Sequence, residues 1–434
     1  MLANRLNSFL ESISFFIFGH GLTSTMKEFI GNLSWSFLGG IITSAILLVV
    51  NILAGRLLGP EEYGKYNIVW AIAQIIMVFV IFGMDASNMR TMSKDTGNNT
   101  KKRSISTVFY FIIFSSSVFS IIYYLVVLNF KSVINIDQNI LLMSLLLGIV
   151  LAFRQLLDSF LRALSKFKRQ SFIKIVEAVI IFVTFAVLLK KIGNYDYSSY
   201  IIALVCGGIF AIGSYLFVIR KYFTMFDFKI LEKRFSYAKI MFIASILGII
   251  FGSLDKIVIA KYMSFHDLGI YSAYYTASFA LAAQFMVFFD NVFFPTVARY
   301  KSDIKTILKK VDRLSLVLIL PLYIAMCGVI YFIMLLFGKD YNINLFFILS
   351  FGFLAVLKML LSVNSSLVTV HSNESLKKAI YLGNSINIIF IIIFVLILPH
   401  ITISIQFMIL ALIFYHILLL VVVRYIFYSL KFHK

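Results

Sequence analysis

Ionisable side chains inside long apolar runs are the residues of this sequence best suited to do chemistry. Arg154 and Asp158 stand four residues apart in one run, and Lys174 and Glu177 stand three apart in the next. At helical spacing each pair shares a face. A charge inside a membrane helix costs roughly 2.5–3.5 kcal/mol on insertion scales, so each of these residues needs a reason to be there. Two interpretations stay open: a gating or binding network, and two self-neutralising pairs.

Lys358 is the most isolated of these charges. It lies between Val356, Leu357, Met359 and Leu360, with no acidic residue within one turn. From the middle of an apolar helix a lysine reaches water only in part. We therefore expect Lys358 to face a wet cavity, an acid on another helix or an anionic ligand, and we prefer the cavity to a structural pairing.

Further charged residues lie nearer the ends of apolar runs. Asp255 and Lys256 are adjacent in the sequence, so they point in different directions and do not neutralise each other on one face. With Arg56, they are expected either to line the outer mouth of a cavity or to reach water by snorkelling. Asp85 and Asp290 mark the ends of two other runs, where a gate and a helix cap or ion pair are equally open interpretations.

His416 is a candidate for titration near neutral pH. It is alone on an apolar run, so a response to a proton gradient competes with ordinary hydrogen-bonded packing. Cys206 and Cys327 lie in apolar runs too, and the six histidines form no H-x-x-x-H pair. The sequence therefore predicts no disulfide framework, no metal site and no catalytic residue set.

The elements that must position these residues follow from composition. The 434 residues are 61% hydrophobic and 13% charged, with a mean hydropathy of +0.97. An ordinary globular domain carries about 25% charged residues. Soluble enzymes, secreted domains and nucleic-acid-binding proteins are thereby excluded, despite a formal charge of +20. What remains is a bundle of membrane-spanning helices of about 20 apolar residues each.

Twelve apolar runs are long enough to cross a bilayer, and their continuous character excludes the alternating strands of a membrane barrel. The sequence thus predicts an all-α integral membrane protein of about twelve transmembrane helices. The predicted spans are roughly 34–58, 66–84, 104–128, 139–160, 172–189, 199–219, 237–260, 270–294, 314–336, 344–370, 379–398 and 402–423.

Basic residues set the orientation of these spans. The loops assigned to the cytosol hold 27 of the 39 lysines and arginines, and the alternate loops hold 6. This asymmetry over short loops places both chain termini in the cytosol. Residues 1–33 form a separate segment, predicted as a cytosolic or interfacial helix, with Met26 as an alternative start of translation.

A shift of 205 residues aligns the turn after the first span with the turn after the seventh, without a gap. It places Gly64 on Gly269 and Tyr66 on Tyr271. The match preserves charge sign and the turn glycine rather than identity, and the alternative is that any two helical hairpins with acidic turns look alike. We predict a six-helix lobe over 34–219, a cytosolic linker over 220–236 and a second six-helix lobe over 237–434. Parallel repeats of this kind are a transporter plan with the substrate between the halves.

Residues 55–66, with the sequence GRLLGPEEYGKY, resemble the first-hairpin signature of bacterial polysaccharide repeat-unit flippases. That family is the polysaccharide transport branch of the MOP superfamily, which also holds MATE drug exporters and lipid II flippases. A degraded copy occupies residues 260–271, and the resemblance covers roughly residues 26–430. The motif itself is structural, because Gly59 and Pro60 end a helix and a glycine supplies the turn.

The resemblance implies a MATE-like, V-shaped bundle that moves an undecaprenyl-pyrophosphate-linked oligosaccharide, such as an O-antigen unit, from the inner to the outer leaflet of the bacterial cytoplasmic membrane by alternating access. A cationic cavity would accept the pyrophosphate, and we assign Lys358, Arg154, Lys256 and Arg56 to it. Asp158, Lys174, Glu177, Asp85, Asp290 and Asp255 are assigned to gating or a charge network.

The resemblance also implies coupling to H⁺ or Na⁺, with His416 as a candidate for the proton, and no cofactor. The expected partners are the bilayer, the polysaccharide polymerase and the chain-length machinery. The main alternative is a MATE-type cation-coupled drug antiporter, which would prefer acidic residues in its cavity. A membrane enzyme is disfavoured, because the connections between spans are too short to hold an external active site.

Overall fold

The computed structural model describes residues 24–92, 97–129, 137–192, 195–288, 304–371, 373–393 and 404–429. In these ranges the chain is all helical, as predicted, and contains no strand. The elements are α2 (Ser24–Ile81), α3 (Met84–Met92), α4 (Asn98–Asn129), α6 (Gln138–Ala163), α7 (Phe167–Ile192), α8 (Tyr197–Ile219), the short 3₁₀ helix η1 (Arg220–Tyr222), α9 (Phe228–Tyr262), α10 (Phe265–Phe288), α12 (Ile304–Phe337), α13 (Leu345–His371), α14 (Asn373–Ile392) and α15 (Ile405–Ser429).

Every predicted span coincides with a helix over its described residues. Helix α2 contains the first two spans, as two helices that meet at a kink where Gly59, with a φ of 77°, has a non-helical backbone and Pro60 begins the second helix. In the described part of the chain, nine helices are long and apolar enough to cross a membrane, with α2 counted once. Residues 24–33 of the predicted N-terminal segment are the first turns of α2, and residues 1–23 lie outside the described ranges.

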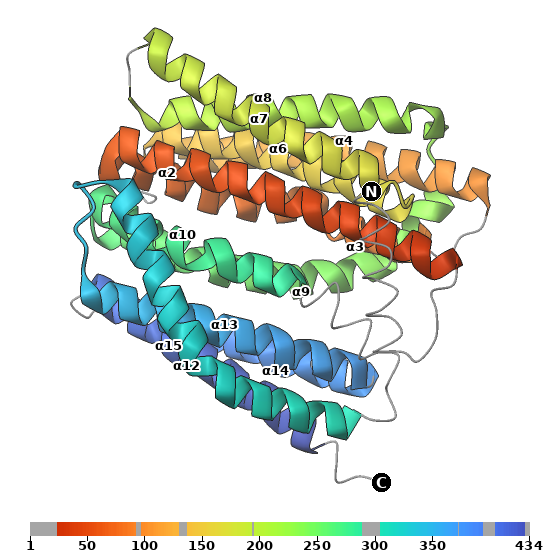
Figure 1. Cartoon of the computed structure of the whole chain (residues 1–434). Helices are drawn as coiled ribbons and strands as arrows, with labels where there is room; N and C mark the ends of the chain where they lie inside the picture. The colour runs from red at the N-terminus through yellow and green to blue at the C-terminus, as the bar shows by residue number, and fades with distance from the viewer. Residues whose placement is uncertain are drawn as a thin grey trace, which may run out of the picture.

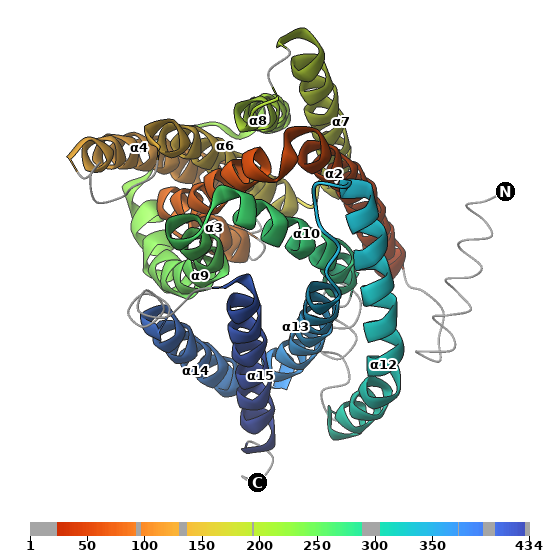
Figure 2. The same ribbon diagram turned by 90° about the vertical axis from the view of Figure 1, so that its left-hand side faces the viewer.

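The helices run along a common bundle direction, and the start of α2 and the end of α15 lie at the same end (Figure 1). Helices α2, α4, α6, α7 and α8 gather on one side, and α12 to α15 gather on the other. Helices α9 and α10 lie between the two groups (Figure 2). The bundle therefore consists of two halves whose boundary runs along α2, α9 and α10.

The first turns of α9 reach across the boundary between the halves, at the end of the bundle where α2 begins. The Asp227 carboxylate accepts hydrogen bonds from Lys229 N at 3.0 Å and Ile230 N at 3.3 Å, so the helix begins at Phe228, inside the predicted linker 220–236. The cap thus extends α9 nine residues beyond the predicted start of its span at residue 237. These additional turns pack on the N-terminal half.

That contact is close. Ser87 Oγ of α3 donates a hydrogen bond to the carbonyl oxygen of Arg234 at 2.7 Å. The Phe82 ring stacks on Phe235, with centroids 5.2 Å apart. A Cβ on Gly83 would overlap the carbonyl oxygen of Ala238.

The same end of the bundle is strongly basic. The connections after α6 and α8 lie there, as do α3 and the start of α4 (Figure 1). Burial lowers the pKa of Lys166, and the positive charges of Lys221 and Arg169 lower it further. This is the end that the charge asymmetry predicts to be cytosolic. Its cations are Arg90, Lys101, Lys102, Arg103, Arg162, Lys166, Lys168, Arg169, Arg220, Lys221, Lys229, Lys233 and Arg234.

At the opposite end, the two equivalent turns pack against each other reciprocally. A Cβ on Gly64 would overlap the carbonyl oxygen of Phe265, and a Cβ on Gly269 would overlap the carbonyl oxygen of Pro60. Both pairs obey the 205-residue relation, since Pro60 aligns with Phe265 as Gly64 aligns with Gly269. Such reciprocity is the contact pattern of a two-fold axis. Only glycine permits the two backbones to approach this closely.

We expect Gly64→Ala to destabilise the protein by about 1–3 kcal/mol, because the added methyl meets backbone atoms rather than a flexible side chain. The measurement is the midpoint of unfolding in detergent. Gly213→Ala in α8 is the matched control, since a Cβ there meets nothing within 4 Å. Equal stability of the two variants would contradict the reciprocal packing.

Candidate functional site

Lys358 of α13 lines a cavity of about 390 Å³ in the C-terminal half. Helices α9, α10, α13 and α15 surround it, and Figure 2 shows these four helices facing one another. The expectation that Lys358 faces a cavity is therefore met by its position. The polar residues of the lining are Asp255, Tyr275, Lys358, Ser362, Ser365, Tyr415 and His416.

Aromatic rings contact the ammonium groups of Lys358 and Lys256. Lys358 Nζ donates a hydrogen bond to the Tyr275 hydroxyl at 3.2 Å and lies 3.7 Å from the centroid of the Phe279 ring. Lys256 Nζ lies 4.9 Å from the centroid of the Tyr275 ring, on the same side chain. Cation–π contacts of this kind stabilise a cation by about 0.5–2 kcal/mol. Among the described residues, no carboxylate oxygen lies within 4.0 Å of either ammonium.

Asp255 lines the same cavity, but both of its oxygens already accept hydrogen bonds. The Tyr271 hydroxyl donates to Oδ2 at 2.5 Å, and the backbone N of Lys256 donates to Oδ1 at 2.8 Å. Asp255 is 3% exposed and Lys256 is 9% exposed. The snorkelling interpretation of these two residues is therefore wrong, because both side chains are buried. Arg56 is exposed beside Gly338 at the end of α12, which agrees with the alternative that this side chain reaches water.

His416 lines the cavity from α15, and its Nδ1 donates to the carbonyl oxygen of Leu412 at 2.8 Å. That bond is what the packing interpretation expects. Asp85 accepts a hydrogen bond of 3.4 Å from Gln155 Nε2 of α6. Asp290 lies outside the described residues.

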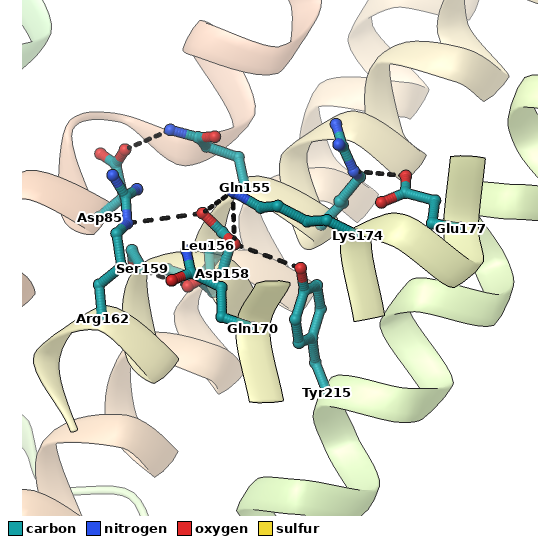
Figure 3. A network of polar contacts seen from close by, with 11 residues as sticks. Asp85, Gln155, Leu156, Asp158, Ser159, Arg162, Gln170, Lys174, Glu177 and Tyr215 are labelled. Carbon is teal, nitrogen blue, oxygen red and sulfur yellow. Dashed lines mark hydrogen bonds and ion pairs between the residues drawn. The ribbon is translucent and has the colours of Figure 1, made fainter. Parts of the chain in front are cut away.

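A second cluster of charges lies in the N-terminal half, between α6 and α7 (Figure 3). Arg154 Nε pairs with Glu177 Oε1 at 2.5 Å, and Lys174 Nζ pairs with Asp158 Oδ1 at 3.1 Å. The predicted pairing within each helix is thus wrong: the charges pair between the helices. The reason is that α6 and α7 lie side by side, so that the nearest opposite charge is on the neighbouring helix.

Asp158 is the most completely satisfied group of this network. Its oxygens accept hydrogen bonds from Gln170 Nε2 at 2.7 Å and the Tyr215 hydroxyl at 3.2 Å, and Arg162 Nε lies at 3.5 Å (Figure 3). Gln170, Tyr215 and Arg162 were not predicted from the sequence as members of this network. The available signal was that polar residues are rare in these apolar helices and so tend to accompany a buried charge.

The C-terminal cavity also contains residues that the sequence argument did not select. Tyr415 and Ser362 of the lining carry no charge, and Phe279, which contacts Lys358 beside the cavity, resembles any other core residue by type. Only the folded arrangement shows that these side chains surround Lys358. Within the described ranges no group of three His, Cys, Asp or Glu side chains is placed to hold a metal ion.

Comparison with known proteins gives a family and a fold. A protein family described as "Polysaccharide biosynthesis protein" matches residues 52–346. Among curated proteins, no match is found. Solved structures match over nearly the whole chain. The lipid II flippase MurJ in an inward closed conformation is 18% identical, with a TM-score of 0.65, over 91% of this chain and 87% of that one.

Two further solved structures share this fold at low identity. The MATE multidrug transporter DinF-BH is 16% identical, with a TM-score of 0.64, over 94% of this chain and 96% of that one. A MOP superfamily transporter from Pyrococcus furiosus is 11% identical, with a TM-score of 0.56, over 93% and 97% of the two chains. Similarity at these identities establishes the shared helical architecture.

The pairing between α6 and α7 predicts a specific energetic coupling. In a double-mutant cycle we expect Arg154→Gln and Glu177→Gln to couple by about 1–3 kcal/mol, as residues in direct contact do. The cycle of Arg154→Gln with Asp158→Asn is the control, and its coupling should be clearly smaller. Unfolding midpoints in mixed micelles measure both. A larger coupling in the second cycle would return Arg154 to the pairing within its own helix.

Proposed function

This chain belongs to the polysaccharide biosynthesis protein family, and from this premise we propose that it is a flippase for a lipid-linked oligosaccharide. Its family and its fold are those of membrane transporters rather than enzymes. The substrate of the proposal is an undecaprenyl-pyrophosphate-linked repeat unit, moved from the cytosolic to the outer leaflet of a bacterial cytoplasmic membrane. Both chain termini are on the cytosolic side in this proposal.

The observation that carries the proposal is the ammonium group of Lys358, which lines the C-terminal cavity and has Lys256 close by on the same tyrosine ring. Lys256 and Lys358 lie against the Tyr275 ring without a carboxylate within 4.0 Å among the described residues. Placing a cation in the membrane is unfavourable unless a counter-charge compensates it. A pyrophosphate supplies that counter-charge when it binds.

The two halves supply the mechanism of the proposal. At the outer end they meet through the two glycine turns, and at the basic end the first turns of α9 meet α3. Alternating access requires one of these contacts to open while the other holds. The head group enters from the basic end, while the lipid tail remains in the bilayer throughout.

A cation-coupled drug antiporter is the competing proposal, because Asp255 lines the cavity and a cationic drug requires an acidic group. The geometry favours the anionic substrate, since both oxygens of Asp255 are engaged by Tyr271 and by a backbone amide. The Lys358 ammonium then remains in the lining of the cavity, and the Lys256 ammonium lies nearby against the same Tyr275 ring. The polysaccharide polymerase and the chain-length machinery are the partners that would use the product.

Deletion of the gene distinguishes the two proposals. The flippase proposal expects lipid-linked repeat units to accumulate in the inner leaflet and surface polymer to disappear, and mass spectrometry of the trapped lipid then identifies the glycan. Normal polymer together with new drug sensitivity would reject the flippase and favour the antiporter.

Lys358→Ala tests the cavity itself. A charged hydrogen bond contributes about 1.5–3 kcal/mol, so we expect surface polymer synthesis in a deletion strain to fall about tenfold or more. Membrane insertion should stay normal. Lys261→Ala is the control, because Lys261 is an exposed residue at the outer end of α9. Unchanged polymer with Lys358→Ala would remove Lys358 from the binding site.

A further inference from the structure

Glu177 is the one carboxylate of the N-terminal network that is only half satisfied. It is 4% exposed, and its Oε1 pairs with Arg154. Its Oε2 has no hydrogen-bond partner in the described part of the chain. Leaving such an atom buried and unpartnered costs about 1–3 kcal/mol, so an unpartnered Oε2 indicates that something else binds there.

A small cavity of about 50 Å³ lies at this carboxylate. It is lined by Glu177, Arg154 and Lys174 together with Thr43 and Trp70 of α2. Thr43 is 8% exposed, and its Oγ1 is likewise without a partner among the described residues. A cavity of this size has room for a water molecule, and Glu177 Oε2 and Thr43 Oγ1 are unpartnered polar atoms of residues in its lining. Water can therefore carry a proton to Oε2.

The charges around the cavity decide which ion fits it. Arg154 and Asp158 of α6, Lys174 of α7 and Tyr215 of α8 are the titratable groups near Glu177. Helix α2 contributes no charge to the lining. With two cations at the lining, a sodium ion is repelled, whereas a proton enters as part of the carboxyl group. Asp158 is already held by several donors.

We propose that Glu177 is the protonation site of the N-terminal half. A proton from the aqueous phase, passed on by water in the small cavity, binds Oε2, the carboxylate becomes a neutral acid, and the ion pair with Arg154 is lost. One of the ties between α6 and α7 is then released, while the bonds from Gln170 and Lys174 to Asp158 persist. This assignment moves the proton site from His416, whose Nδ1 is held by the Leu412 carbonyl oxygen.

Infrared difference spectroscopy on the purified full-length protein in nanodiscs tests the proposal. Exposed carboxyl groups stay ionised down to about pH 5, so the pH is lowered from about 9 to 5. We expect the carbonyl band of a protonated carboxylic acid to appear, and to be absent in Glu177→Gln. Glu61→Gln is the matched control at an exposed position of the outer turn, and it should keep the band. No band in the native protein, or an unchanged band in Glu177→Gln, would overturn the proposal.

Tryptophan fluorescence tests whether the protonation takes place at the small cavity. The chain has two tryptophans, and Trp70 lines the small cavity. In a Trp35→Phe background, Trp70 emission should change with the same midpoint as the infrared band. Thr43→Val provides a second variant that keeps Glu177 and Arg154 in place if Glu177→Gln does not fold. Losing the hydroxyl removes a polar group that can hold water in the cavity, so the charged carboxylate is less well solvated and the midpoint should move to higher pH. An unmoved midpoint would also overturn the proposal.

The proposal goes beyond the flippase function and depends on it only for the use made of the proton. Protonation is read on the protein alone, without a glycan lipid. A chain that titrates at Glu177 but moves no lipid-linked glycan would reject the proposed function and keep this site. A chain that moves the glycan but shows no such titration would reject this protonation site and keep the proposed function.

Discussion

The rest of the structure depends on the contact between the two glycine turns. Gly64 contacts the backbone of Phe265, and Gly269 contacts the backbone of Pro60. Equivalent residues of the two halves therefore make the same contact in both directions. Both Tyr63 on α2 and the turn motif around it are anchored at this contact, since the Tyr63 hydroxyl lies 3.2 Å from Thr276 Oγ1 of α10. This contact brings α2 and α10 together along the boundary of the halves. The motif that carries the family resemblance therefore forms a packing contact between the two halves and is not a binding site.

The two halves deal differently with charges inside the membrane. In the N-terminal half, Arg154 and Lys174 pair with carboxylates of the neighbouring helix, so the charges stabilise the contact between α6 and α7. In the C-terminal half, Lys256 and Lys358 contact aromatic rings, and Lys358 also donates a hydrogen bond to the Tyr275 hydroxyl. A paired network suits a structural tie or a switch, whereas unpaired cations suit an anionic ligand. Because of this difference, we propose a protonation site in the N-terminal half and an anion-binding cavity in the C-terminal half.

Much of the fold could be predicted from the sequence, because each span is a continuous apolar run and the turn glycines recur at a fixed shift. The cavity position of Lys358 was also predictable, since a lone lysine between four apolar residues has few other places to go. The partners of Arg154 and Lys174 were not predictable from spacing along one helix, because spacing does not reveal which helix lies alongside. The burial of Asp255 and Lys256 was missed for the same reason: depth along a helix does not show which side faces a neighbour. The start of α9 depended on the capping carboxylate of Asp227, a local signal that hydropathy does not contain.

The central claim is that this protein carries a lipid-linked anionic glycan across the bilayer. The most direct measurement reconstitutes the purified chain in vesicles that hold a labelled polyprenyl-pyrophosphate oligosaccharide in both leaflets, and follows the fraction that an external glycosidase can reach. The account predicts that glycan protected in the inner leaflet of protein-free vesicles becomes accessible when the protein is present. A protected fraction that stays the same with and without the protein, under an imposed pH or sodium gradient as well as without one, would contradict it.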